Sequence, residues 1–121
     1  MPANKIALIG AGRMATALAR GFINARIMRA EAIRASDPVP AAREAFEREV
    51  PGVQVADDNT SIVEHAEIVI LAVKPQQIGD VLAEVRGTVS RDALVVSIAA
   101  GITLERLASG LPAGQRIVRV M

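Results

Sequence analysis

The residues with the clearest chemistry form a glycine-rich turn near the N-terminus. They read Gly10-Ala11-Gly12-Arg13-Met14-Ala15, directly after a short apolar run and directly before a stretch with helical periodicity. Gly10 permits the tight turn, Gly12 lets the main chain approach a pyrophosphate with no Cβ in the way, and small Ala15 lets the helix lie close to the strand. The helix N-terminus then offers unpaired N–H groups and the positive end of its dipole to phosphates. The pattern predicts dinucleotide binding; the alternative is a glycine turn that joins strand and helix for structural reasons alone.

A second polar group, Ser36-Asp37-Pro38, lies about 22 residues beyond the glycine turn, where dinucleotide-binding folds contact the adenosine ribose. Asp37 can accept a hydrogen bond from a 2′-hydroxyl. A 2′-phosphate about 4 Å away would meet a like charge, at a cost of about 1 kcal/mol in water and about 4 kcal/mol near a protein surface. This favours NADH, whereas Ser36 as a donor and Arg34 or Arg43 as counter-charges would favour NADPH. Asp37 could also simply begin a turn before Pro38.

The elements that must position these residues follow an alternating pattern. Six apolar runs read as strands, at residues 5–9, 32–36, 53–56, 68–73, 94–99 and 116–120. Because runs 68–73 and 94–96 lack polar alternation, helices should cover both faces of those strands. Strand and helix alternating at this spacing imply parallel strands joined by right-handed crossovers. The predicted fold is α/β, a doubly wound parallel sheet of the Rossmann type with about six strands, formed as one domain over residues 1–121.

Helical patterns fill the gaps between the predicted strands. At 13–25 an apolar stripe of Met14, Leu18, Phe22 and Ala25 is expected to pack on the sheet. At 40–49 the helix opens with Pro40 and offers Ala41, Ala45 and Phe46, opposite a charged face of Arg43, Glu44, Glu47 and Arg48. Asn59 is placed to cap a short helix ending near His65, residues 76–85 form another helix, and Thr103 caps one at 104–107.

Composition limits the possible partners. The chain has 121 residues, a net charge of +1 and only 2% aromatic residues, which argues against a nucleic-acid-binding protein. It has no cysteine and one histidine, so we expect no metal site, and we interpret His65 as a surface residue without a catalytic role. The longest apolar run has six residues against the roughly 20 of a membrane helix, so we expect no membrane contact and a cytoplasmic location.

Four motifs together resemble a known family. They are Gly10-Ala11-Gly12-Arg13-Met14-Ala15, Ala72-Val73-Lys74-Pro75-Gln76, Ser97-Ile98-Ala99-Ala100-Gly101-Ile102 and Val118-Arg119-Val120-Met121. In order and spacing they look like successive motifs of pyrroline-5-carboxylate reductase. The resemblance implies reduction of 1-pyrroline-5-carboxylate to proline by hydride from NADPH or NADH, as the last step of proline synthesis.

The resemblance also implies roles for particular residues. Ala72, Val73, Lys74 and Pro75 would border the nicotinamide end of the cofactor, and Ala99, Ala100 and Gly101 would help to close the site. The ends of parallel strands are where a doubly wound sheet binds ligands, which agrees with this placement. Lys74 could instead be a solvated charge at a helix entry, and Pro75 could serve only to start its helix.

Two departures from the family limit the transfer. Arg13 stands where the family usually has Asn, so it could pair with a phosphate or point to solvent. The family continues after the last motif into a helical domain that makes the dimer and supplies most of the substrate pocket. Because the sequence stops inside a predicted strand, we interpret the chain as truncated before that domain and inactive alone; the alternative is a small domain that ends on an edge strand.

The catalytic residues are therefore unknown, and a homo-oligomer is expected for the full-length protein. Rival interpretations share the nucleotide-binding half. They are a β-hydroxyacid dehydrogenase, a deazaflavin-dependent oxidoreductase, and a module that binds nucleotide without catalysis.

Overall fold

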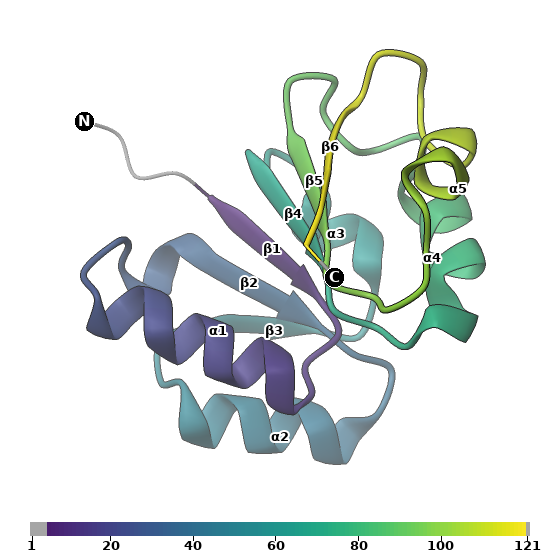
Figure 1. Ribbon diagram of the computed structural model, residues 1–121. Helices are drawn as coiled ribbons and strands as arrows, with labels where there is room; N and C mark the ends of the chain where they lie inside the picture. The colour runs from purple at the N-terminus through teal and green to yellow at the C-terminus, as the bar shows by residue number, and fades with distance from the viewer. Residues whose placement is uncertain (1–4, 121) are drawn as a thin grey trace.

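The computed structural model describes residues 5–120 and shows a six-stranded, fully parallel sheet (Figure 1). The strands are β1 (Ile6–Ile9), β2 (Ile33–Ser36), β3 (Gln54–Ala56), β4 (Ile68–Leu71), β5 (Leu94–Ser97) and β6 (Arg116–Arg119). Their order in the sheet is β3-β2-β1-β4-β5-β6, so the order reverses direction between β1 and β4. This is the Rossmann strand order, and it confirms the predicted fold class.

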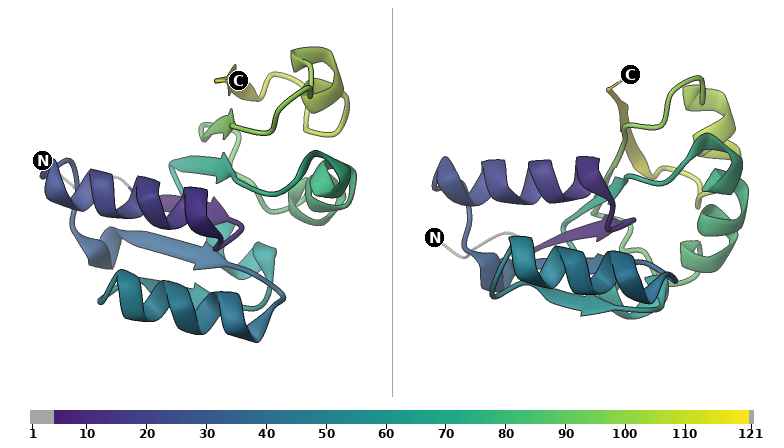
Figure 2. Two further views of the ribbon diagram at one scale, coloured as in Figure 1. Left: turned by 60° about the horizontal axis from the view of Figure 1, so that its bottom comes forward. Right: turned by 90° about the horizontal axis from the view of Figure 1, so that it is seen from below.

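Helices cover the sheet on both sides (Figure 2). They are α1 (Arg13–Asn24), α2 (Pro40–Glu49), α3 (Asn59–Val63), α4 (Ile78–Val85) and α5 (Leu104–Ser109), with single 3₁₀ turns at Ala30–Ala32 and Pro75–Gln77. The first two helices share a core with one face of the sheet, and the last three share a core with the other face. The molecule is therefore a three-layer sandwich in which each helix is the crossover between two parallel strands.

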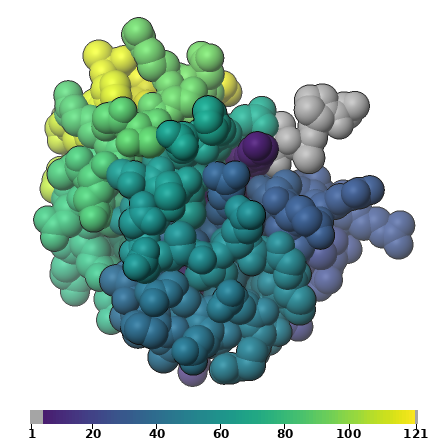
Figure 3. All heavy atoms as spheres, turned by 180° about the vertical axis from the view of Figure 1, so that it is seen from behind, coloured from purple at the N-terminus to yellow at the C-terminus, as the bar shows by residue number. Residues whose placement is uncertain are grey.

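The central strands supply both cores. In β1, Ile6 and Leu8 face α1 and α2, while Ala7 and Ile9 face the opposite layer, and β4 divides its side chains in the same way. Seen from behind, teal and green residues, the colours of α3 and α4, make up much of the surface (Figure 3). Phe46 of α2 is fully buried, and burying a side chain of that size contributes about 1.5–3 kcal/mol.

The face of α1 that packs on the sheet differs from the predicted stripe. Met14 is 53% exposed and Ala25 is also exposed, so the prediction was wrong at both positions. Ala15 and Ala19 are buried instead, and Leu18 and Phe22 on the same face are half-buried. The resulting steps of three, one and three are those of a helix that contacts its core. Small alanines at the contact let α1 approach the sheet closely.

Two smaller departures concern α2 and β5. Ala41 is exposed and Arg43 is half-buried, because the Arg43 guanidinium donates to the backbone carbonyl of Asp37 at 2.8 Å. At β5, Leu94 and Val96 are only half-buried, whereas Val95 is buried. Coverage of both faces is therefore nearly complete at β4, where only Ile68 is half-buried, and partial at β5.

The N-cap of α3 is Asp58, whereas the sequence had suggested Asn59. One Asp58 carboxylate oxygen accepts hydrogen bonds from the Ser61 backbone N–H and the Thr60 hydroxyl, both at 2.9 Å. Asn59 is the first helical residue, and its side chain turns toward the sheet. Thr103 caps α5 as predicted, by accepting from the Arg106 backbone N–H at 3.1 Å.

We predict an acid-sensitive contribution to stability from Asp58. The backbone N–H of Ser61, followed by the hydroxyls of Ser61 and Thr60, holds the pKa of Asp58 below its usual value of 3.8. A lowered folded pKa means that the stabilisation is present above pH 3.8 and is lost as pH falls through the folded pKa. Asp58→Ala should therefore lower the Tm at pH 7 by a few degrees, and by less near pH 2. Thermal unfolding followed by circular dichroism at several pH values measures this; an equal loss at every pH would contradict it.

Candidate functional site

The glycine turn connects β1 to α1 at the carboxyl end of the sheet. Gly10 has a φ of +103°, and its N–H donates to the Ser36 carbonyl at 2.8 Å. A Cβ on Gly10 would lie 2.7 Å from the carbonyl oxygen of Ala72. Both the backbone angle and the lack of space therefore require glycine here.

Gly12 differs from Gly10, because the protein itself does not require a glycine there. It is the N-cap of α1 with extended backbone angles and makes no side-chain capping bond, and a Cβ on it would meet nothing within 4 Å. Nothing in the protein therefore demands glycine at this position. No side chain caps the first-turn N–H groups of α1. The position fits a pyrophosphate, because a phosphate on these N–H groups would occupy the space that a side chain would otherwise fill.

Asp37 stands opposite the glycine turn at the end of β2. One carboxylate oxygen accepts from the Ala11 N–H at 3.0 Å, and the other accepts from the Val39 N–H at 2.9 Å. A carboxylate has about four lone-pair sites, so each oxygen keeps capacity for a second donor. Asp37 both starts the turn before Pro38 and presents an acceptor, so the two interpretations offered by the sequence are compatible.

A cleft of about 290 Å³ opens between these two features at the point where the strand order reverses. Ligands bind at this position in doubly wound sheets. The lining joins β1, β2 and β4 to α4 through Gly10, Asp37, Val73, Gln77 and Val81. Of the predicted residues, Gly10, Ser36, Asp37 and Val73 line this cleft, whereas Ala11, Gly12 and Arg13 line the groove beside α2.

Sequence reasoning missed the acidic lining of this cleft. It includes Asp57 and Asp58 after β3, together with Asp80 and Glu84 on α4, and the neutral Asn59 lies among them. The Asn59 side chain accepts from the Ser36 hydroxyl at 2.6 Å and donates to Glu84 at 2.8 Å. An available indication was the position of Asp57 and Asp58 at the carboxyl end of a predicted strand.

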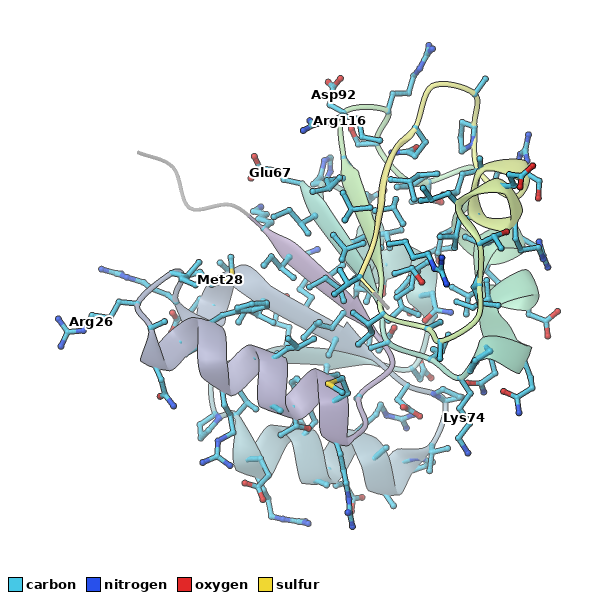
Figure 4. The ribbon with its side chains drawn as sticks, viewed as in Figure 1. Arg26, Met28, Glu67, Lys74, Asp92 and Arg116 are labelled. Atoms are coloured by element: carbon cyan, nitrogen blue, oxygen red, sulfur yellow. The ribbon has the colours of Figure 1, made fainter. Side chains whose placement is uncertain are left out.

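The motif after β4 lies at the same end of the sheet. Ala72 and Val73 are half-buried, whereas Lys74 and Pro75 are exposed. Figure 4 shows Lys74 near the carboxyl ends of the strands. Pro75 starts a 3₁₀ turn, so α4 begins at Ile78, two residues later than predicted.

The motif after β5 is divided between core and surface. Ala99 is buried, with its N–H donating to the Ser97 hydroxyl at 3.2 Å, while Ala100 and Gly101 are exposed. Gly101 has a φ of +78°. The exposed part of this motif follows a strand end, as ligand-binding loops in such sheets do.

Arg13 projects from the first turn of α1 into a groove beside α2. The groove, of about 420 Å³, is also lined by Gly12, Arg20 and Ala42. Arg13 is exposed, and a cation at a helix N-terminus opposes the helix dipole. The structure therefore places Arg13 beside the N-terminus of α1 and outside the acidic cleft.

A larger hollow of about 630 Å³ lies at the amino ends of β4, β5 and β6. His65, Glu67, Asp92 and Arg116 line it, and Figure 4 shows Glu67, Asp92 and Arg116 at the end of the sheet opposite Lys74. We assign the site to the smaller cleft, because ligands of parallel sheets bind at the carboxyl ends of the strands. His65 is exposed and far from the glycine turn, in agreement with its interpretation as a surface residue.

No helix within residues 5–120 is both long enough and apolar enough to cross a membrane. Over the same residues, no three or more His, Cys, Asp or Glu side chains are grouped so that they could hold a metal ion.

Comparison with known proteins agrees with this geometry. Residues 5–101 match the family described as NADP oxidoreductase, coenzyme F420-dependent. The chain belongs to this family. It is also 41% identical over 121 residues to the pyrroline-5-carboxylate reductase of Methanosarcina acetivorans, covering 100% of this chain and 44% of that protein.

Solved structures give the same result. The pyrroline-5-carboxylate reductase of Coxiella burnetii superimposes with a TM-score of 0.91 at 32% identity, covering 99% of this chain and 44% of that one. The Plasmodium falciparum pyrroline carboxylate reductase with NADP bound gives 0.83 at 28% identity, covering 100% of this chain and 43% of that one. The chain thus spans less than half the length of the relatives that it matches.

Proposed function

We propose that this chain is the nucleotide-binding domain of an NAD(P)H-dependent pyrroline-5-carboxylate reductase, which converts 1-pyrroline-5-carboxylate to L-proline. The observation that carries the binding function is the open, uncapped N-terminus of α1 at Gly12, beside the cleft where the strand order reverses. The similarity to several pyrroline-5-carboxylate reductases supports the choice of substrate.

In this proposal the glycine turn and the first turn of α1 hold the pyrophosphate, and the end of β2 holds the adenosine ribose. These residues are Gly10, Ala11, Gly12, Arg13, Met14 and Ala15 for the turn, and Ser36 and Asp37 for β2. Ala15 and Ser36 are buried, so they act by supporting neighbours and not by direct side-chain contact.

The nicotinamide end would lie toward β4 and β5. Ala72, Val73, Lys74 and Pro75 would border it, and Ala99, Ala100 and Gly101 would close the site. A bound reduced nicotinamide nucleotide supplies the hydride. The chain's own task is to hold the reactive ring in a fixed orientation toward the substrate and to keep the phosphates neutralised.

We further propose that the substrate pocket and the subunit contacts of a homo-oligomer come from residues outside this chain. The relatives are more than twice as long, so they contain sequence that could provide both. In this proposal no proton donor is assigned to residues of this chain.

The function is tested in two stages. Calorimetric titration of the 121-residue chain with NADH and NADPH should show saturable binding of at least one nucleotide, with a dissociation constant below about 1 mM. The chain alone should not oxidise NAD(P)H when 1-pyrroline-5-carboxylate is added, whereas a full-length protein containing it should. Folded chain that binds neither nucleotide would overturn the binding function.

The family description favours one second candidate, hydride exchange between a nicotinamide nucleotide and coenzyme F420. The same full-length protein separates the two. Oxidation of NADPH by F420 without any by 1-pyrroline-5-carboxylate would support this candidate and exclude the first.

A further inference from the structure

The cleft beside the glycine turn carries charge of a single sign. Its lining includes five carboxylates and no lysine or arginine. They are Asp37, Asp57, Asp58, Asp80 and Glu84. A concave site lined by one sign of charge focuses the field within it, so the negative potential exceeds that of any single exposed carboxylate.

Asp37 is the carboxylate best placed to contact a ribose. The bonds from the N–H groups of Ala11 and Val39 fix its orientation toward the glycine turn. The acceptor positions left free on the two oxygens suit the paired 2′- and 3′-hydroxyls of an adenosine ribose. A phosphate at the 2′ position would replace one donor with a doubly charged acceptor, so it would lose the hydrogen bond and be repelled.

The polar neighbours of Asp37 cannot reverse this preference. Ser36 is fully buried, and its hydroxyl donates to the Asn59 side chain at 2.6 Å. The Asn59 amide group in turn donates to Glu84 at 2.8 Å. The Ser36 hydroxyl and one N–H of the Asn59 amide are held by these partners, and a phosphate would have to break those bonds to use them.

Three cations lie near this end of the sheet, and only Arg43 contacts Asp37. Arg34 donates to the Ser61 carbonyl at 3.5 Å, on the α3 side of β2. Arg43 donates to the backbone carbonyl of Asp37 at 2.8 Å, and Arg13 lines the groove between α1 and α2. None of the three belongs to the lining of the acidic cleft.

We propose that this chain selects NADH over NADPH, because its adenosine subsite repels a 2′-phosphate. This inference rests on the proposed nucleotide-binding function and goes beyond it. It also runs against the family description, which names NADP, and differs from the NADP found in the Plasmodium falciparum relative. Asp37 is the specificity-determining residue, and the other four carboxylates strengthen its effect.

Calorimetric dissociation constants for NADH and NADPH on the unmodified chain test this preference directly. NADH should bind at least about tenfold more tightly, which corresponds to about 1.4 kcal/mol. Raising NaCl from about 20 mM to about 500 mM should bring the dissociation constants of NADH and NADPH closer together, since salt screens repulsion between partly exposed charges. Tighter binding of NADPH would overturn the inference and leave the proposed function intact. Binding of neither nucleotide would overturn both.

Three variants test which residues cause the preference for NADH. Asp37→Asn keeps the shape of the side chain and removes the charge, so it should shift the ratio toward NADPH at least about tenfold. Asp80→Asn, which leaves the Asp37 backbone contacts untouched, should shift it in the same direction by about twofold to threefold. Asp92→Asn changes the net charge equally at the opposite end of the sheet (Figure 4) and should leave the ratio unchanged.

Arg43→Gln tests the one cation that contacts Asp37. It should leave NADPH affinity unchanged within about twofold. A loss of NADPH affinity of about tenfold or more would show that Arg43 holds the 2′-phosphate and would overturn the inference. The inference would also be overturned if Asp37→Asn and the unmodified chain had the same ratio of NADH to NADPH affinity.

Discussion

Gly12→Asp should weaken nucleotide binding at least about 100-fold while leaving the fold intact, a loss of about 2.7 kcal/mol. Gly12 has a φ of −85° and a ψ of −161°, which any residue adopts, and a Cβ there meets no neighbour. An Asp carboxylate at an N-cap accepts from the N–H groups of the first helical turn, so it would occupy the phosphate donors and add a repelling charge. Asp at this position therefore stabilises the helix N-terminus and hinders nucleotide binding.

Calorimetry with NADH and NADPH and thermal unfolding of the same sample check both halves of this prediction. The Tm should stay the same or rise slightly, since Asp is a somewhat better N-cap than Gly. Gly87→Asp is the matched control, because Gly87 is exposed, follows α4 and also has open space around it. If Gly12→Asp and Gly87→Asp bound nucleotide equally well, the pyrophosphate could not lie on the α1 N-terminus.

Gly10→Ala should have the opposite profile, with a large loss of stability. A non-glycine residue at a φ of +103° is strained, and the added Cβ would lie 2.7 Å from the Ala72 carbonyl oxygen, which belongs to backbone following β4. We expect a loss of about 3 kcal/mol or more in the free energy of unfolding, and a Tm lower by at least about 10 °C. Urea unfolding followed by circular dichroism measures it.

Gly114→Ala separates the two causes in that experiment. Gly114 has a φ of +84°, and a Cβ added there would have no neighbour within 4 Å, so only the backbone angle is penalised. It should cost about 1 kcal/mol. Equal losses for Gly10→Ala and Gly114→Ala would mean that contact with the β4 backbone contributes nothing, against our account of why β1 and β4 approach so closely at the site.

The sequence was sufficient for the order and type of the main elements. Alternating apolar runs and helical stretches predicted six parallel strands, and Pro40 and Thr103 correctly marked the starts of two helices. These features depend on residues close together in the chain, whose side-chain periodicity and capping preferences act locally. The glycine turn was recognisable for the same reason, since strand, turn and helix are contiguous.

The predictions that failed concern the tertiary contacts of individual side chains. The apolar residues of α1 allowed more than one buried face, and close approach to the sheet selected the face with Ala15 and Ala19 over one with Met14. At α3, Asp58 and Asn59 were both acceptable caps. The Asn59 side chain does not cap the helix, because it forms hydrogen bonds with Ser36 and Glu84 instead.

The residue types of this chain thus determined a Rossmann-type domain with a glycine-rich turn between β1 and α1, whereas the acidic character of the cleft was decided only by the tertiary structure. Its carboxylates come from the end of β2, the end of β3 and from α4, and Ser36, Asn59 and Glu84 are joined across separations of 23 and 25 residues. Parallel crossovers carry such distant segments to one edge of the sheet, so their charges add in one small volume. No local pattern in the sequence encodes that sum.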